Sequence, residues 1–432
     1  MSFEWNEISL GEVVGPINTG LDAIKRAPIV EFETGIRCLR IQDVSQSKSF
    51  SNWGHSRVTP NDFEKYRLRK NEIIMARTCS PGLCFLVKEN VHAVFNNGLA
   101  RVRADESRVT PKFLYYIFKA QDFAEYIYGI AHGTSVQLNM KVGDLARYKF
   151  KLPPLFSQNK IAEILSTLDD RITLLRETNA TLEAITQALF KSWFVDFDPV
   201  RAKLEGRAPE GMDDATAALF PDGFEESELG LVPRGWRVLP IGDAVAAVGG
   251  ATPDTKNPAY WEPAIHCWTT PKDLSGIAAP ILLDTERRLS DEGLAKIGSG
   301  ALPIGTLLLS SRAPIGYIAL AQVPLAINQG YIAMLPGGLL PPLYMLFWCR
   351  QNMENIKGRA NGSTFMEISK KAFRPIPALV PPPEIVQAFV DVAGVLFERL
   401  IENEKQAQTL ATLRDTLLPR LISGALRLPE VT

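Results

Sequence analysis

The sequence is poor in the side chains that form metal sites, disulfide frameworks and catalytic triads. Its 432 residues include five cysteines and four histidines. The cysteines are odd in number and scattered, which is typical of reduced thiols in a cytoplasm. The histidines have no zinc-ligand spacing with one another or with the cysteines. We therefore expect neither a disulfide-stabilised fold nor a metal site.

Long apolar runs are also absent. No run reaches the roughly 18 uninterrupted apolar residues of a membrane span, and Met1-Ser2-Phe3-Glu4-Trp5 has neither the basic nor the apolar region of a secretory signal. These absences predict a cytoplasmic protein that makes no membrane contact.

Catalytic motifs are missing as well. The chain has no Gly-x-x-x-x-Gly-Lys-Ser/Thr string and no Gly-x-Ser-x-Gly elbow. Asn257-Pro258-Ala259-Tyr260 resembles the catalytic string of amino-methylating DNA methyltransferases, but Ala replaces the second Pro and no Gly-rich turn for a methyl donor precedes it. Pro253-Asp254 could begin a nuclease motif, yet no Glu-x-Lys follows. We expect no catalytic residue.

An internal repeat dominates what is present. The offsets between matching residues are 231, 234, 231 and 229, and a Pro-Pro pair follows each copy, Pro153-Pro154 and Pro381-Pro382. A duplicated unit with diverged surfaces can recognise two similar but non-identical targets. The matching residues are Trp5, Gly82, Asn97 and Gly133 in the first copy and Trp236, Gly316, Asn328 and Gly362 in the second.

Charge follows the repeat, although the net charge is only −1. Residues 1–150 carry 20 Lys/Arg against 16 Asp/Glu, and residues 233–380 carry 14 against 10, a balance of +4 in each. Residues 151–232 carry 8 against 15 and residues 381–432 carry 5 against 7. The balance in either block alone is within ordinary surface variation. Its recurrence indicates polyanion binding by the two copies and protein contact by the acidic segments.

Each copy is predicted to be an α+β module. In the first copy, apolar runs bounded by turn residues predict strands over Ile36–Val44, Glu72–Ala76, Cys84–Val87 and Gly98–Arg103, and apolar spacing predicts one helix over Thr110–Ile127. In the second copy, strands are predicted over Leu307–Ser310, Tyr317–Ala321 and Gly330–Leu335, with one helix over Pro342–Lys357.

A long helix is predicted after each Pro-Pro pair, with Ser157 as the N-cap of the first. Apolar residues spaced three and four apart, with one Asn among them, are typical of a coiled-coil seam in which the Asn fixes the register. We expect the two helices to pack on each other; alternatively, each packs on its own module. The seams are Ile161, Leu165, Leu168, Ile172, Leu175, Asn179, Leu182, Ile185 and Leu189, and Phe389, Val392, Leu396, Leu400, Asn403, Ala407, Leu410, Leu413 and Leu417.

The predicted division of the chain follows from these patterns. Residues 1–152 form the first module and 153–197 the first long helix. Residues 198–232, rich in Pro and acid, form a linker with a short helix over Met212–Phe220. Residues 233–379 form the second module and 380–432 the second long helix.

Recurrent loops carry the residues that we expect to contact DNA. Loop Arg77–Gly82 corresponds to Ser311–Gly316, and a Gly-hydroxyl loop followed by lysine recurs near Gly133 and Gly362. Cations and hydroxyls suit phosphate, and Arg and Gln read guanine and adenine edges. The alternative for each residue is a tight turn. The candidates are Arg77, Thr78, Ser80, Gly82, Asn97, Gly133, Thr134, Ser135, Gln137, Lys141, Ser311, Arg312, Gly316, Asn328, Gln329, Gly362, Ser363, Thr364, Lys370 and Lys371.

Three strings resemble sequences of the specificity subunits of type I restriction–modification systems. They are Phe190-Lys191-Ser192-Trp193-Phe194-Val195-Asp196-Phe197-Asp198-Pro199, the Gly249-Gly250-Ala251-Thr252-Pro253 string with Trp261, and Leu417-Leu418-Pro419-Arg420-Leu421. With the repeat, the resemblance covers essentially the whole chain. The first module departs from it, having Asn18-Thr19-Gly20-Leu21-Asp22 in place of Gly-Gly-x-Thr-Pro.

The resemblance implies two target-recognition domains separated by two helices that form an antiparallel coiled coil, with pseudo-two-fold symmetry. It also implies double-stranded DNA as the target and two methylation (M) subunits and restriction (R) subunits as partners. S-adenosylmethionine, ATP and Mg would bind those partners, and this chain would be a non-catalytic specificity subunit.

Such helices would act as a ruler between two half-sites. Helices over about 34 residues span roughly 50 Å, or on the order of 15 base pairs of DNA. Because the two copies differ in sequence, the target should be bipartite and asymmetric. The alternatives are a free-standing DNA methyltransferase-like enzyme and a non-catalytic protein-binding scaffold.

Overall fold

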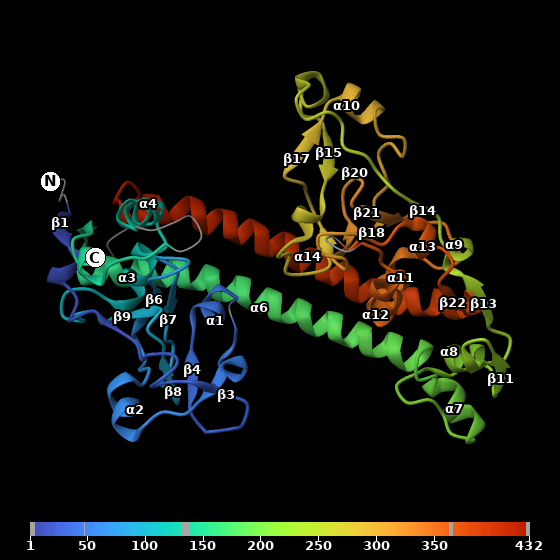
Figure 1. Ribbon diagram of the computed structural model, residues 1–432, viewed down its shortest axis with the longest axis horizontal. Helices are drawn as coiled ribbons and strands as arrows, with labels where there is room; N and C mark the ends of the chain where they lie inside the picture. The colour runs from blue at the N-terminus through green and yellow to red at the C-terminus, as the bar shows by residue number, and fades with distance from the viewer. Residues whose placement is uncertain (1–4, 47, 132–137, 363–365, 429–432) are drawn as a thin grey trace. The chain divides into compact units, whose positions relative to one another are not determined.

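The computed structural model describes residues 5–46, 48–131, 138–362 and 366–428, and the chain divides into two compact units (Figure 1). The first unit contains the residues up to Ile172 and those from Thr409 onward, and the second contains Thr173–Gln408. Each unit therefore holds one copy of the repeat and a part of both long helices.

The first module contains two four-stranded sheets, of strand order β2-β9-β6-β7 and β3-β5-β4-β8. Strands β6, β8 and β9 are buried along their whole length, which explains the uninterrupted apolar sequences of β6 and β8. In β9 the buried Arg101 is the one charged residue. The strands are β2 (Asn18–Thr19), β3 (Ile29–Val30), β4 (Arg37–Leu39), β5 (Gly54–Ser56), β6 (Ile73–Ala76), β7 (Cys84–Leu86), β8 (Ala93–Phe95) and β9 (Leu99–Val102). The helices are α1 (Ile41–Ser45), α2 (Pro60–Tyr66), α3 (Pro111–Ile117), α4 (Gln121–Ile130) and α5 (Val142–Leu145).

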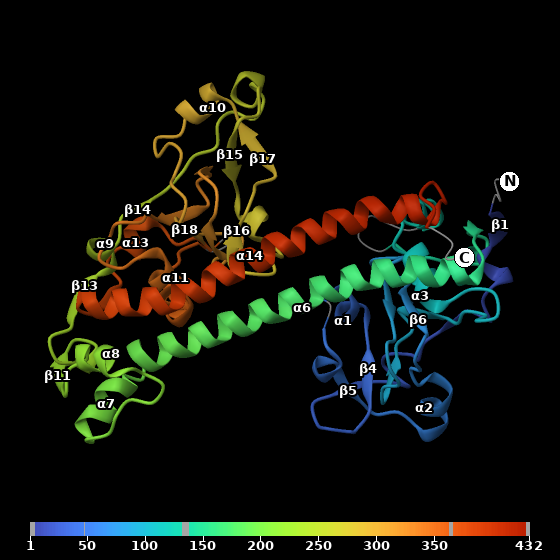
Figure 2. The same ribbon diagram turned by 180° about the vertical axis from the view of Figure 1, so that it is seen from behind.

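The second module contains a five-stranded sheet, β14-β21-β18-β19-β16, and a three-stranded sheet, β17-β15-β20. In Figure 2, the antiparallel strands β15 and β17 lie side by side below α10, and β17 leads into it. The strands are β14 (Ala247–Val248), β15 (His266–Thr269), β16 (Ile281–Leu282), β17 (Arg287–Leu289), β18 (Leu307–Ser310), β19 (Ile318–Ala321), β20 (Leu325–Ile327) and β21 (Tyr331–Met334). The helices are α9 (Ile241–Ala244), α10 (Asp291–Ala295), α11 (Pro342–Gln351), α12 (Met353–Gly358) and α13 (Lys370–Phe373).

The strand pairings repeat between the modules, as duplication predicts. In the first, β6 lies between β9 and β7, and in the second, β18 lies between β21 and β19. The parallel pair β4 and β8 recurs as β15 and β20. Each module is also closed by an antiparallel strand pair at its ends, β1 (Asn6–Ser9) with β10 (Lys149–Leu152) and β13 (Arg237–Pro240) with β22 (Pro377–Val380). The predicted α+β class with internal duplication is confirmed.

Most predicted strands are confirmed with ends displaced by one or two residues, but Ile36–Val44 is wrong beyond Leu39. Helix α1 begins there because the Asp43 carboxylate accepts hydrogen bonds from the backbone N and the Nε of Arg40, at 3.0 Å each. These bonds satisfy a donor at the helix start and end the strand.

Two predicted single helices are each broken into two. Between α3 and α4 the chain turns, and the rings of Phe118 and Phe123 come to 4.7 Å, so both are buried. Between α11 and α12, the Asn352 side chain donates to the Trp348 carbonyl at 2.9 Å. Such local hydrogen bonds compete with helix continuation, and apolar periodicity alone does not reveal them.

The long helices are α6 (Leu155–Phe194) and α14 (Pro383–Ile422), of 40 residues each. Ser157 is not the N-cap, because α6 begins directly after the proline pair and the Pro154 carbonyl accepts from the Gln158 N–H at 3.0 Å. Within the first unit, Ile161 and Leu165 of α6 share one core with Phe113 of the module and Leu418 of α14. The helices thus pack both on each other and on a module, so both of the predicted arrangements occur.

The linker, residues 198–232, contains more secondary structure than we expected from a sequence without helical or strand periodicity. The short helix predicted over Met212–Phe220 is confirmed as α8 (Asp214–Leu219). Two further elements were not predicted: helix α7 (Asp198–Leu204) and the hairpin of β11 (Phe224–Ser227) and β12 (Gly230–Pro233). Both are too short to produce a periodic signal. Among the described residues, no helix is long and apolar enough to cross a membrane.

Candidate nucleic-acid interface

In the first module, loop 77–82 leaves β6 and is held by the Arg77 guanidinium. Its Nη1 donates to the Asn97 carbonyl at 3.1 Å and its Nη2 to the Asn139 Oδ1 at 3.3 Å. The backbone of Thr78 also forms a β-bridge with Asn139. Arg77 therefore joins three chain segments and is half-buried, while Ser80 is exposed.

In the second module, loop 311–316 leaves β18 in the same way. The Ser311 N–H donates to the Gly330 carbonyl at 2.8 Å, and the Ser311 carbonyl accepts from Ile368 at 3.0 Å. Arg312 forms a β-bridge with Glu367 and an ion pair of 3.7 Å with its carboxylate. The Arg312 side chain remains partly exposed, whereas Ser311 is buried.

Shared hydrogen bonds define which residues of the two loops correspond. The backbone N–H of Arg77 donates to the Gly98 carbonyl, as the backbone N–H of Ser311 donates to the Gly330 carbonyl. The N–H groups of Gly82 and Gly316 donate to the Ala76 and Ser310 carbonyls. Cys79 and Ala313 both have positive φ, 62° and 53°. The two loops thus share these hydrogen bonds and a positive φ at the third position. The cation is at the first position of loop 77–82 and at the second position of loop 311–316. The corresponding pairs are Arg77 and Ser311, Thr78 and Arg312, Cys79 and Ala313, and Gly82 and Gly316.

The proposed correspondence of Asn97 with Asn328 is wrong by one residue. Asn328 donates from its N–H to the Thr269 carbonyl at 3.1 Å, and the residue that makes the equivalent bond, to Leu39 at 3.2 Å, is Asn96. Asn97 therefore corresponds to Gln329, and both are exposed. The repeated Asn-Gly spacing was misleading because the first copy has two consecutive asparagines.

A second pair of equivalent residues was missed. At Gly250, an added Cβ would lie 1.8 Å from the Ile327 carbonyl oxygen, and at Gly20 it would lie 2.3 Å from that of Phe95. Only glycine permits this approach. The following N–H groups, of Ala251 and Leu21, donate to those same carbonyls. Gly20 therefore performs the role of Gly250, although a single shared Gly was too weak a signal to identify in the sequence.

These turns bring further side chains to the loops. The Thr252 Oγ1 donates to the Gln329 Oε1 at 2.6 Å, which orients the Gln329 amide. In the first module, Asp22 stands at the position of Thr252, and its carboxylate instead accepts from the N–H groups of Lys25 and Ile24. These two hydrogen bonds lower the pKa of Asp22. The two modules thus present a carboxylate, Asp22, and a hydroxyl, Thr252, at corresponding places.

The remaining candidates lie near the same edge or outside the described residues. Lys141 is exposed before α5, and Lys370 and Lys371 are exposed at the start of α13, with Lys370 Nζ 3.1 Å from where a Cβ on Gly249 would be. Gly362 is exposed with a φ of 123°. The other six candidates lie outside the described residues: Gly133, Thr134, Ser135, Gln137, Ser363 and Thr364.

The side chains at these loops suit binding better than catalysis. They are cations, amides, hydroxyls and free backbone groups. No cluster of three His, Cys, Asp or Glu that could hold a metal ion occurs among the residues that the structure describes. Burial raises the pKa of Cys38 and of Cys84 to about 12, so these thiols stay protonated.

The structure also places the helix-seam residues. The Asn403 Nδ2 donates to the Asn179 Oδ1 at 2.9 Å, and the Asn179 Nδ2 donates to the Leu400 carbonyl at 3.2 Å, with both asparagines buried. Because Phe190 and Phe389 also meet, at 5.7 Å, the helices are antiparallel in the second unit. Ile161, Leu165, Ile172, Leu175 and Leu400 are buried, and Leu168, Leu182, Leu189, Leu396, Leu410 and Leu417 are half-buried.

Three residues of the predicted stripes are exposed instead: Ile185, Val392 and Leu413. The buried positions of α14 include Phe389, Ala393 and Phe397, which also belong to the module core. The helix must satisfy two neighbours at once, so its buried face departs from a strict coiled-coil seam.

Comparison with known proteins agrees with this architecture. Residues 3–184 and 233–412 match the family model described as the type I restriction modification DNA specificity domain. The chain is 26% identical over 468 aligned residues to the type I restriction enzyme HindI specificity subunit of Haemophilus influenzae, covering 98% of this chain and 99% of that protein. It is 37% identical over 185 residues to the MjaIX specificity subunit of Methanocaldococcus jannaschii, covering 42% of each.

A solved structure has the same fold. The type I restriction-modification S subunit from M. genitalium aligns over 100% of this chain and 98% of its own, with a TM-score of 0.56 and 18% identity. The family match spans both modules and most of both long helices. The chain therefore belongs to the family of type I restriction–modification specificity subunits.

Proposed function

We propose that this chain reads double-stranded DNA at two different half-sites, one with each module, as the non-catalytic specificity subunit of a type I restriction–modification complex. One observation carries the proposal: the same loop framework recurs in both modules with different side chains on it. Several backbone hydrogen bonds of loops 77–82 and 96–98 recur in loops 311–316 and 328–330. A duplicated framework with exchanged side chains is suited to reading two unequal sequences.

The side chains divide into two roles. Lys141 in the first module and Lys370 and Lys371 in the second are exposed cations suited to phosphate, which positions a protein on DNA without reading sequence. Asn97 and Gln329 present amides that can pair with adenine, and Arg312 presents a guanidinium that can pair with guanine. The Arg77 guanidinium already donates two hydrogen bonds within the protein. We therefore assign Arg77 to stabilising loop 77–82 rather than to base recognition.

The helix pair would set the distance between the half-sites. At about 1.5 Å per residue, a 40-residue helix is about 60 Å long. The half-sites would then be on the order of 15 to 18 base pairs apart, centre to centre. An antiparallel helix pair would relate the modules by a two-fold axis of the kind that relates DNA strands, and unequal modules would make the target asymmetric.

Partner subunits complete the proposed complex. We assign methylation, with S-adenosylmethionine, to two M subunits, and ATP- and Mg-dependent restriction to R subunits, all in the cytoplasm. The acidic balance of residues 151–232 supports protein rather than DNA contact by the helices and linker.

The direct test is selection from random-sequence duplex DNA by the chain together with its M subunits, followed by sequencing. We expect two conserved blocks of unequal sequence separated by a fixed spacer, with affinity that falls steeply with salt. Enrichment of one continuous block, or of none, would contradict the proposal. Binding of S-adenosylmethionine by the isolated chain would favour the methyltransferase alternative, and failure to bind any duplex would favour a scaffold.

A further inference from the structure

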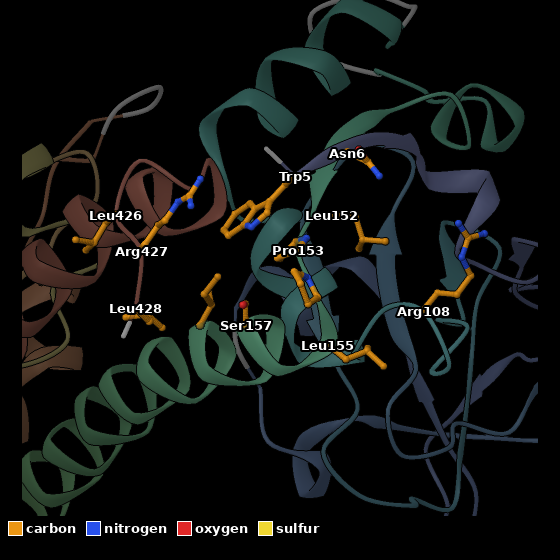
Figure 3. A pocket seen from close by; sticks show the side chains of 12 residues that line it. Trp5, Asn6, Arg108, Leu152, Pro153, Leu155, Ser157, Leu426, Arg427 and Leu428 are labelled. Carbon is orange, nitrogen blue, oxygen red and sulfur yellow. The ribbon is translucent and has the colours of Figure 1, made fainter. Parts of the chain in front are cut away.

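A cleft of about 590 Å³ lies in the first unit, between the beginning of the chain, the start of α6 and the segment after α14 (Figure 3). In Figure 3, Trp5 projects between Leu426 of that segment and Pro153 before α6. Two exposed apolar side chains adjoin it at the start of α6, Leu155 at 38% and Phe156 at 51% exposure. The cleft shares no residue with the recognition loops.

The repeat identifies the counterpart of this cleft in the second unit. Trp236 stands before β13 as Trp5 stands before β1, and Pro381-Pro382 precede α14 as Pro153-Pro154 precede α6. Just past the end of each helix comes a residue with positive φ, Phe197 at 57° and Gly424 at 77°. Both face the tryptophan of their own unit.

In the second unit this place is filled. The Phe197 ring lies 5.7 Å from Trp236, and the Phe224 ring of β11 lies 6.0 Å from Phe197. Phe220 packs on Trp193 at 5.2 Å. The linker, from α7 to β12, thus covers Trp236 and leaves it only 4% exposed.

In the first unit the corresponding cover is missing from the described residues. Gly424, the residue with positive φ that faces Trp5, has no side chain, and a Cβ there would lie 3.2 Å from the Trp5 ring. Trp5 stays partly exposed. The tryptophan that Phe197 and the linker cover in the second unit thus stays partly exposed in the first, where it lines the cleft.

Charge distinguishes the open cleft from its filled counterpart. Arg108 and Arg427 line it, and Lys151 is exposed beside Leu152. Arg108 precedes α3 by three residues, and the same position before α11 is the apolar Leu339. The linker segment that covers the counterpart carries Asp222, Glu225, Glu226 and Glu228.

We propose that this cleft is the docking site for a segment of a partner polypeptide that inserts aromatic side chains and places carboxylates against the cationic rim. The chemistry is that of residues 219–229 of this chain, Leu-Phe-Pro-Asp-Gly-Phe-Glu-Glu-Ser-Glu-Leu, which perform the same role within the second unit. The docking is independent of base recognition, so the two proposals can fail separately.

The test uses the full chain and a fluorescein-labelled peptide of residues 219–229, with fluorescence anisotropy as the measurement. We expect saturable binding at one site. Replacing both peptide phenylalanines, Phe220 and Phe224, by Ala should weaken it about tenfold or more, because each buried ring contributes on the order of a tenfold factor. DNA binding should be unchanged by saturating peptide.

Two variants locate the site. Ser157→Trp places a large side chain in the cleft and should weaken peptide binding about tenfold or more. Arg108→Glu should weaken it several-fold at low salt and less at high salt. The matched control is Arg147→Glu, which reverses another exposed charge of the same unit outside the cleft and should leave peptide binding unchanged.

Three results would overturn the proposal. The first is the absence of saturable peptide binding, and the second is binding that neither Ser157→Trp nor Arg108→Glu weakens. The third is a rise in peptide affinity of tenfold or more after removal of residues 429–432, which would identify the cleft's occupant as the chain's own end.

Discussion

The two modules meet the long helices through corresponding residues of opposite chemistry. In the first unit, the Tyr116 hydroxyl donates to the Asp169 carboxylate at 2.9 Å, which also pairs with Lys119 at 3.3 Å and Arg414 at 2.6 Å. Tyr116 corresponds to Phe347, 231 positions later, and Asp169 corresponds to Phe397, 228 positions later. In the second unit these two rings meet edge to face at 5.7 Å. A polar network and an aromatic pair thus occupy the same place.

This difference shows which features the two copies still share and which have diverged. Several backbone hydrogen bonds, the close approach of Gly20 and Gly250 to a carbonyl, and the order of the central strands recur in both copies. Side chains that only need to fill a space or face solvent have diverged. The same holds for the loops, where Thr78 stands in place of Arg312. We infer that the modules can change what they recognise without changing how they fold.

The largest expected effect comes from replacing one of the two modules entirely. Exchange of residues 233–380 for the second module of another family member should replace the second half-site and leave the first intact. Preference for the original second half-site should fall about a thousandfold or more, the usual gap between specific and non-specific binding. Genome-wide methylation mapping measures this, and a change in both half-sites would contradict independent modules.

A single side chain should sharpen the comparison at the loops. Arg312→Ala should weaken recognition of the second half-site about 10- to 100-fold, since one good base contact is worth about 1–3 kcal/mol. The first half-site should be unaffected. The control is Arg359→Ala, which removes an exposed arginine of the same module that bonds Asn355. Equal losses in the two variants, measured on DNA altered in one half-site at a time, would make Arg312 a general contact.

The asparagine pair tests the seam in the second unit. Asn403→Leu leaves the Asn179 oxygen buried without its donor, and should lower the free energy of unfolding by about 1–3 kcal/mol. Replacing both by Leu should restore most of that loss, because no polar group is then left unsatisfied. Urea unfolding followed by circular dichroism measures both. Equal losses in single and double variants would show that the pair does not act as a unit.

The smallest expected effect is a pH dependence of the free energy of unfolding, which distinguishes the polar network at Asp169 from the aromatic pair at Phe397. Burial alone would raise the pKa of Asp169, but Lys119, Arg414 and Tyr116 together lower it. A lowered folded-state pKa stabilises the protein above the unfolded value of about 3.9, and that stability is lost as the pH falls through the folded value. Asp169→Asn should therefore cost about 1 kcal/mol at neutral pH, and the difference from the unsubstituted chain should shrink below about pH 4.

The aromatic counterpart provides the control for that experiment. Phe397→Leu should cost about 1 kcal/mol through lost packing, by the same amount at every pH at which the chain is folded, because neither Phe397 nor Phe347 titrates. A pH-independent cost for Asp169→Asn would show that its charge contributes nothing to the attachment.

The sequence predicted the duplication, the buried strands and the long helices because each leaves a signal over many residues. The strand over Leu307–Ser310 is confirmed at both ends, since an apolar run bounded by turn residues has one reading. Helix breaks at Ala120 and Asn352 were not predictable, because they depend on a ring contact and one side-chain hydrogen bond.

Local equivalences within the repeat were the hardest to predict. Gly20 matches Gly250 only through a backbone approach to a distant carbonyl, and the offset between Asn96 and Asn328 appears only in the hydrogen bonds. The assignment of loop residues to DNA contact stays a prediction, because phosphate and base contacts leave no mark on the free chain.

The most direct test of the central claim changes the helix length alone. Seven residues would be inserted into both long helices, between Ile172 and Thr173 and between Gln408 and Thr409, which keeps the seam in phase. Each insertion adds about 10 Å. If the helices set the distance between two independent reading modules, the selected DNA should keep both half-sites and gain about three base pairs of spacer. An unchanged spacer with intact half-sites would contradict the account.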